Sequence, residues 1–118
     1  MPVTAKYTLI VSMNVDADKE ALFHEVYNTE HIPLIEKVPG VVSVTRLEAQ
    51  RFQIKVGGKV QDVPLDDRPV YTAIYEIEDP SVLISEAWEA AVEAGRWATD
   101  VRPFTSNRQF SLKVNLGA

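Results

Sequence analysis

The sequence predicts an α+β fold whose elements follow the order strand-helix-strand-strand-helix-strand. Three observations predict it: apolar residues alternate with a period of two near both ends of the chain, an i, i+3, i+4 apolar stripe lies between 84 and 95, and Pro33 interrupts an earlier helical pattern. The chain has 118 residues, 46% of them hydrophobic and 25% charged, which is the composition of one globular domain spanning 1–118.

The first strand is expected over 7–15, where the odd-numbered residues are apolar. A helix should begin at about Ala17, because Asp16 and Asp18 can each cap its free amides. Pro33 donates no backbone hydrogen bond and disfavours helix at the residue before it, so we expect a kink or break between 29 and 32. A short second helical segment should end at Pro39 and Gly40.

The region 41–56 is rich in β-forming residues but long for one strand, which predicts a bulge or bend at 49–51. Two glycines then predict a turn, and 59–69 is interpreted as a loop or a partly paired hairpin arm. Strands are also expected over 70–77 and 109–116. Between them lies the second helix, with Asp79 or Ser81 as its cap and an apolar stripe of Ile84, Ala87, Trp88, Ala91, Val92 and Gly95.

Two β-α-β units in series predict the ferredoxin-like βαββαβ arrangement, a four-stranded antiparallel sheet with two helices on one face. The opposite face would then be mixed, with Thr8, Ile10, Ser12, Ser111 and Lys113 on it. A mixed face suits packing against a second sheet better than bare solvent does. We therefore predict a homodimer that forms through the sheet faces.

Charge and composition exclude several classes of protein. The net charge is −5, the pI is about 5.0 and the basic residues are dispersed, which argues against nucleic-acid binding. Without cysteine there is no disulfide, thiolate nucleophile or cysteine metal site. No apolar stretch could span a bilayer, and the N-terminus shows no basic leader or cleavage pattern. A soluble cytoplasmic protein without a membrane partner is expected.

One run of residues resembles a known family. It reads Tyr27-Asn28-Thr29-Glu30-His31-Ile32-Pro33-Leu34 and is followed by Val38-Pro39-Gly40-Val41. This is similar to the EthD-like branch of the dimeric α/β-barrel superfamily, whose members carry an aromatic residue, His-x-Pro-Leu and then Pro-Gly. The resemblance implies two ferredoxin-like domains that form a barrel, each with a small-molecule cleft between helices and sheet. The polar extension within 41–69 departs from a minimal member and puts the shape of the cleft in doubt.

His31 is the first candidate for a catalytic residue, because imidazole titrates near neutral pH and can exchange a proton with a phenol, an enolisable carbonyl or a hydroxyl leaving group. In a structural alternative, His31 caps the broken helix by donating to carbonyls that Pro33 leaves unpaired. Tyr27 lies one turn earlier and could contact a substrate oxygen or ring, or could be a core aromatic. Asn28 lies on the adjoining line of the helix and is a further candidate for substrate binding.

Trp97 could line the cleft or cover the dimer partner, whereas Trp88 is expected in the core. Arg102 could bind an anionic group through bidentate hydrogen bonds from its guanidinium, although a surface ion pair is the commoner role. Glu30 is expected to be solvated. Its alternatives are an ion pair with Arg46 or Arg102, or a contact that fixes the tautomer of the neighbouring imidazole.

No metal site is predicted, because His24 and His31 are seven residues apart with no suitable carboxylate between them and a kink in the way. No phosphate-cradling loop, nucleophile elbow or dinucleotide fingerprint is found.

Three functional hypotheses follow. The first is a cofactor-free enzyme that acts on a small apolar oxygenated substrate, aromatic or polyketide-like, with His31 as general acid or base. The superfamily includes dehydratases, isomerases and cofactor-free monooxygenases, so the resemblance implies no single reaction. The second is a non-catalytic binding or accessory protein whose imidazole is tied into backbone hydrogen bonds. The third is haem binding or breakdown with His31 as an axial ligand.

Overall fold

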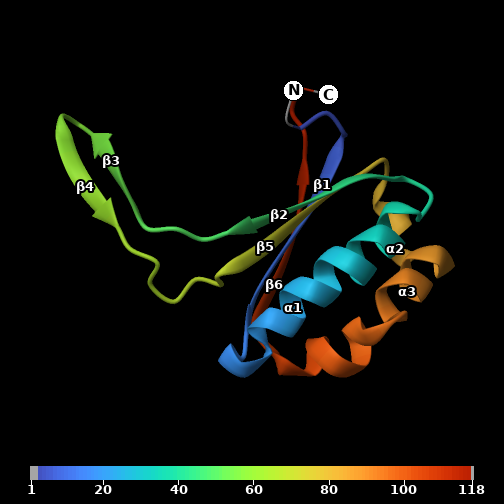
Figure 1. The fold of residues 1–118 in the computed structure, drawn as a ribbon. Helices are drawn as coiled ribbons and strands as arrows, with labels where there is room; N and C mark the ends of the chain where they lie inside the picture. The colour runs from blue at the N-terminus through green and yellow to red at the C-terminus, as the bar shows by residue number, and fades with distance from the viewer. Residues whose placement is uncertain (1–2, 118) are drawn as a thin grey trace.

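The computed structural model, which describes residues 3–117, has a four-stranded antiparallel sheet with helices on one face (Figure 1). The strands are β1 (Tyr7–Val15), β2 (Val41–Glu48), β5 (Tyr71–Ile77) and β6 (Thr105–Val114), in the order β2-β5-β1-β6. The predicted ferredoxin-like fold is therefore confirmed. The last strand begins and ends earlier than the expected 109–116. Among the described residues, no helix is long and apolar enough to cross a bilayer.

The first helical layer is continuous, so of the predicted kink or break at 29–32 the break does not occur, and the helix instead changes to a π-helical turn there. A 3₁₀ turn leads into α1 (Glu20–Val26), a π-helical turn spans Tyr27–His31, and α2 (Ile32–Glu36) follows directly. The backbone amide of Ile32 donates to the carbonyl of Tyr27, five residues back. This wider turn lets the chain pass Pro33 without a break, and π-helical turns of this kind occur frequently at functional sites.

The second helical layer is shorter and more irregular than predicted. It runs through a 3₁₀ turn, α3 (Glu86–Glu93), a π-helical turn at Trp97–Val101 and a final 3₁₀ turn. Ser85 caps α3, since its Oγ accepts from the amide of Trp88 at 3.1 Å. Asp79, one of the two predicted caps, serves the preceding 3₁₀ turn instead. That turn contains Ile84, which is 88% exposed and does not belong to the apolar stripe as expected.

The core lies between the helices and the sheet. Leu9, Val11 and Met13 of β1 are buried, as their alternation predicts. They pack with alternate residues of β5 and with the inner sides of the helices; the largest fully buried side chains are Phe23, Ile35, Ile77, Val26 and Val101. The opposite face of the sheet, which we call the open face, pairs Ile10 with Ile74 and Ser12 with Thr72. Its mixed character is therefore also confirmed.

The edge strand β6 is only partly covered. Its residues Phe110, Leu112 and Val114 pair with Val11, Leu9 and Tyr7, which places them on the helix side of the sheet. They are nevertheless 62%, 43% and 51% exposed, whereas Leu9 is 8% exposed. The helical cover therefore ends between β1 and β6.

A two-stranded hairpin, which we call the arm, projects from the sheet (Figure 1). It consists of β3 (Phe52–Val56) and β4 (Lys59–Val63). Gly57 and Gly58 form the turn between them with φ of 61° and 78°, angles that favour glycine. The predicted bend at 49–51 separates β2 from β3. Of the two interpretations of 59–69, the hairpin arm is therefore the correct one.

Candidate functional site

The π-helical turn places His31 inside the protein, where its side chain is 4% exposed. The imidazole stacks on the indole of Trp97, with ring centroids 4.5 Å apart and an angle of 27° between the planes. The ring of Tyr27 lies edge-on to the imidazole at 5.0 Å. Three of the five residues predicted for the site are thus in mutual contact.

An ion pair between Glu30 and Arg96 joins the two helical segments that carry the stacked rings. The Glu30 carboxylate accepts from the Arg96 amide at 3.0 Å and from its Nε at 2.6 Å. The residues that follow these two in the chain are the stacked His31 and Trp97. A Cβ at Gly95 would come within 2.7 Å of the same carboxylate, and φ there is +69°, so this position requires glycine. Glu30 is partly exposed, as expected of a solvated residue, but its ion-pair partner is Arg96, so the alternatives with Arg46 or Arg102 are wrong.

A cavity of about 220 Å³ opens beside these rings, between the helices and strands β1, β5 and β6. Its lining is mostly aliphatic and aromatic, including Trp88, which was expected in the core. Besides the indole N–H groups of the two tryptophans, polar atoms are carried by four lining side chains: Tyr27, His31, Tyr75 and Arg108. An apolar cavity with a few converging polar groups is the usual form of a small-molecule site.

His31 is neutral at physiological pH. Burial lowers the pKa of the imidazole to about 4, and the positive charge of Arg102 adds to the shift. Its Nδ1 is enclosed and has no hydrogen-bond partner among residues 3–117. The capping alternative is wrong, because the helix is unbroken and the His31 side chain makes no cap hydrogen bond. A neutral imidazole has one acceptor nitrogen and one N–H donor, and its lowered pKa makes it a weaker base than an ordinary histidine.

The hydroxyls of Tyr27 and Tyr75 form a buried pair, 2.5 Å apart, at the cavity wall. Burial raises the pKa of both phenols, so both stay protonated at neutral pH. One hydroxyl donates to the other, and the second proton of the pair remains available to an acceptor. The pair can therefore donate one hydrogen bond to a bound ligand.

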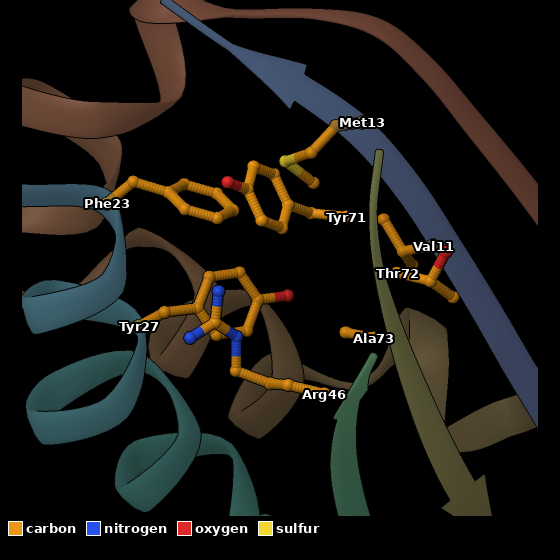
Figure 2. A pocket seen from close by; sticks show the side chains of 8 residues that line it. All are labelled: Val11, Met13, Phe23, Tyr27, Arg46, Tyr71, Thr72 and Ala73. Carbon is orange, nitrogen blue, oxygen red and sulfur yellow. The ribbon is translucent and has the colours of Figure 1, made fainter. Parts of the chain in front are cut away.

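The guanidinium of Arg46 packs against the ring of Tyr27 (Figure 2). Its guanidinium carbon lies 4.6 Å from the centre of the Tyr27 ring and 5.2 Å from that of Phe23. Nη1 donates to Oδ1 of Asn28, and Nη2 donates to Nδ1 of His24, both at 2.9 Å. The hollow beside this cluster has a volume of only about 10 Å³, enough for one water molecule. The cluster therefore holds a ring in place and leaves no room for a ligand.

Two residues predicted for the site lie outside the cavity. Asn28 is exposed and engaged with Arg46. Arg102 forms a bidentate ion pair with Glu93, in which Nη2 donates to Oε1 at 2.8 Å, the commoner role weighed for it. His24 contacts Arg46 and not His31, and no group of three potential ligands for a metal ion is found among the described residues.

Sequence reasoning missed Tyr75, Arg108 and Phe110 as parts of the site. Tyr75 lies in the strand expected over 70–77, but nothing in the strand pattern marked it as a site residue. Arg108 lies at the cavity with its guanidinium carbon 5.4 Å from the ring centre of Phe110. These residues reach the cavity through the pairing of β1 with β5 and β6, which no local pattern specifies.

No family model matches the chain, and no curated protein matches it significantly. Several solved structures share its fold. The haem-degrading protein MhuD from Mycobacterium tuberculosis, with two haems in its active site, has a TM-score of 0.58, 14% identity and coverage of 93% of this chain and 95% of its own. A candidate antibiotic biosynthesis monooxygenase from Nitrosomonas europaea has a TM-score of 0.56, 14% identity and coverage of 93% and 98%. An EthD family protein from Bacillus halodurans has a TM-score of 0.57, 11% identity and coverage of 93% and 99%.

The class that these comparisons define is the ferredoxin-like α+β domain. The identities are low, so the likeness concerns the fold alone, and the names of the similar structures describe different activities. An EthD family protein is among them, in agreement with the resemblance seen in the sequence. The function must be argued from the cavity itself.

Proposed function

We propose that the protein is a small enzyme that needs no cofactor and acts on a small, apolar, oxygenated molecule, such as a phenol or a polyketide-like ring, bound in the cavity. His31 is the proposed base. The observation that carries the proposal is the neutral imidazole of His31, which lines an aromatic cavity of about 220 Å³.

The proposed chemistry begins with proton transfer. The imidazole takes a proton from a phenol or from a carbon next to a carbonyl and becomes imidazolium. The negative charge left on the substrate oxygen accepts the free hydroxyl proton of the Tyr27–Tyr75 pair as a hydrogen bond. A deprotonated substrate of this kind is a common starting point for dehydration, isomerisation and oxygenation by O₂.

The test compares turnover of phenols, polyketide-like phenols and lactones by the wild type and by His31→Ala. The chain contains two histidines, and the other one, His24, lies outside the cavity, so His24→Ala is the matched control. We expect His31→Ala to lose about a hundredfold or more in kcat/KM, and His24→Ala, which removes only an outer partner of Arg46, to lose far less. Unchanged turnover in His31→Ala would end the proposed role.

A non-catalytic binding or accessory role is the second candidate. The mostly apolar lining, in which Arg108 is the single charged residue, favours it. Native mass spectrometry of freshly purified protein would reveal a retained ligand. Retention of that ligand by both the wild type and His31→Ala, without turnover by either, would support binding over catalysis.

The proposed functional unit is a homodimer that forms through the open face. Ile10 and Ile74 are partly exposed there, next to Ser12 and Thr72, and the face is too mixed to be a typical solvated surface. Light scattering coupled to gel filtration should give twice the chain mass at micromolar concentration. A monomer under those conditions would contradict the dimer.

Haem does not fit this cavity. A volume of about 220 Å³ suits a molecule of one or two rings, whereas a porphyrin joins four pyrrole rings in one plane. No step of the proposed chemistry therefore passes through haem.

A further inference from the structure

The arm presents an apolar strip that no other part of the described chain covers. Phe52, Ile54 and Val56 occupy every second position of β3, on one face of the hairpin, and are 52%, 46% and 54% exposed. A two-stranded hairpin with a bare apolar face is marginally stable in water. The strip therefore needs an occupant.

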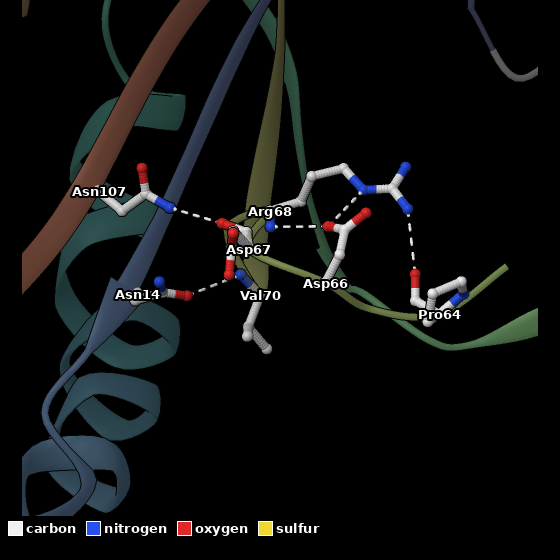
Figure 3. A network of polar contacts seen from close by, with 7 residues as sticks. All are labelled: Asn14, Pro64, Asp66, Asp67, Arg68, Val70 and Asn107. Carbon is white, nitrogen blue, oxygen red and sulfur yellow. Dashed lines mark hydrogen bonds and ion pairs between the residues drawn. The ribbon is translucent and has the colours of Figure 1, made fainter.

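The root of the arm is hydrogen-bonded to the body of the chain (Figure 3). The side chain of Asn107 donates to the carbonyl of Asp67 at 3.0 Å, and the amide of Val70 donates to the side chain of Asn14 at 2.9 Å. These bonds tie the root to β6 and β1. The strands β3 and β4 beyond it stand clear of the sheet and helices (Figure 1).

The arm lies on the side of the open face. A concavity of about 350 Å³ is lined by Ser12, Thr72 and Gln109 of the open face together with Phe52 and Leu65 from the arm and its root. The surface of the arm thus continues the surface through which the proposed dimer forms. A partner that packs on the open face would lie next to the apolar strip.

The body of the chain offers one matching strip. Phe110, Leu112 and Val114 occupy every second position of β6, and the other large exposed apolar side chains of the described body are scattered. Three residues at this spacing span about 13 Å on either strand. Within one chain the arm projects away from β6, so the two strips can meet only between copies.

Charge favours a second copy as the occupant. The arm, residues 52–63, contains two of the 12 Lys and Arg residues and one of the 17 Asp and Glu residues, a net charge of +1, which leaves ten cationic against 16 anionic side chains elsewhere, a net charge of −6. An arm of net positive charge is attracted to an acidic body of the same kind.

We infer that the arm of each copy clasps the edge of the other, with Phe52, Ile54 and Val56 packed on the partner's Phe110, Leu112 and Val114. This inference rests on the proposed dimer. Phe110 also lines the cavity, so the arm closes the uncovered side of the other copy's site. The site is then completed by a neighbouring chain.

Disulfide cross-linking tests the contact, because the chain contains no cysteine. The double variant Ile54→Cys/Leu112→Cys should form a covalent dimer on mild oxidation of the full chain. Val60→Cys/Leu112→Cys is the matched control, since Val60 is 63% exposed but lies on the opposite face of the arm. Equal cross-linking of the two variants, or no covalent dimer from the first, would overturn the inference.

Excision of the arm tests closure of the cavity. An Asn-Gly turn in place of 50–69 can join Ala49 to Val70, because the Ala49 amide already donates to the Val70 carbonyl at 2.7 Å. The buried core cluster contains no residue of the excised segment. Both tryptophans line the cavity, so acrylamide should quench the excised variant about twofold more strongly than the wild type, with circular dichroism unchanged.

Unchanged quenching would show that the arm does not close the cavity. The oligomeric state separates failure of the clasp from failure of the dimer. A wild-type protein that is monomeric refutes the dimer itself, whereas a dimeric protein without the Ile54–Leu112 cross-link refutes only the clasp.

Discussion

The imidazole of His31 lies face to face with the indole of Trp97, 4.5 Å away, although the two residues belong to separate π-helical turns. The neighbouring ion pair of Glu30 and Arg96 joins the two turns. Because the stack encloses the imidazole, protonation of His31 destabilises the folded state relative to the unfolded state.

Stability should therefore fall as the pH drops below the pKa of an ordinary histidine. The pKa of His31 is lowered from 6.5 to about 4 in the folded chain, so between these values the unfolded state binds more protons. Stability from this group is fully present above pH 6.5 and is lost as the pH falls toward 4. The loss should be about 3 kcal/mol, measured by urea unfolding at several pH values.

His31→Phe is the control for this pH dependence, because phenylalanine fills a similar volume against Trp97 and cannot titrate. The stability of this variant should change less on acidification from neutral pH than that of the wild type. Carboxyl groups titrate in both proteins and cancel in the difference. Parallel curves for the two proteins would show that His31 is not buried in its neutral form.

The two phenols at the cavity wall should be energetically coupled. Tyr27→Phe leaves the hydroxyl of Tyr75 without its partner, and the reverse substitution has the same effect on Tyr27. Each single change should cost about 1–3 kcal/mol in the free energy of unfolding. Tyr27→Phe/Tyr75→Phe should cost less than the sum, because no hydroxyl is then left unpaired. Additive costs in denaturant unfolding would show that the pair contributes no coupling.

Gly40 should tolerate no side chain. Its φ is +94°, and a Cβ there would lie 2.4 Å from Cγ2 of Val82. Gly40→Ala should therefore lower the free energy of unfolding by about 2 kcal/mol or more. Gly58 has φ +78°, but no atom lies within 4 Å of the position that a Cβ would take, so Gly58→Ala should cost less, about 1 kcal/mol. Equal costs in thermal or urea unfolding would contradict the role of the Val82 contact.

The sequence was sufficient for most of the fold, because the patterns that define it are local. The alternation of Leu9, Val11 and Met13 indicated both a strand and its buried side. It could not specify the path around Pro33, since a π-helical turn and a break satisfy the same local restrictions. It also could not distinguish Ile84 in a 3₁₀ turn from the first residue of a helical stripe.

The site was only partly predictable for a different reason. His31 and Tyr27 are one turn apart, so local spacing placed them together, and Trp97 was named as a residue that could line the cleft. Asn28 and Arg102 have polar partners, Arg46 and Glu93, that tertiary folding selects. Strand register likewise decides which residues of β5 and β6 reach the cavity, and register is set by the whole sheet.

Haem provides a final test of cavity size. Added to the wild-type protein in equimolar amount, haem should produce no saturable shift of its Soret band, because the cavity of about 220 Å³ cannot enclose the macrocycle. Any weak spectral change from surface adsorption should be the same in His31→Ala. By contrast, 1-naphthol, a two-ring phenol, should quench the fluorescence of the cavity tryptophans and be displaced by other small phenols. A saturable Soret shift that disappears in His31→Ala would reverse this conclusion and make His31 a haem ligand.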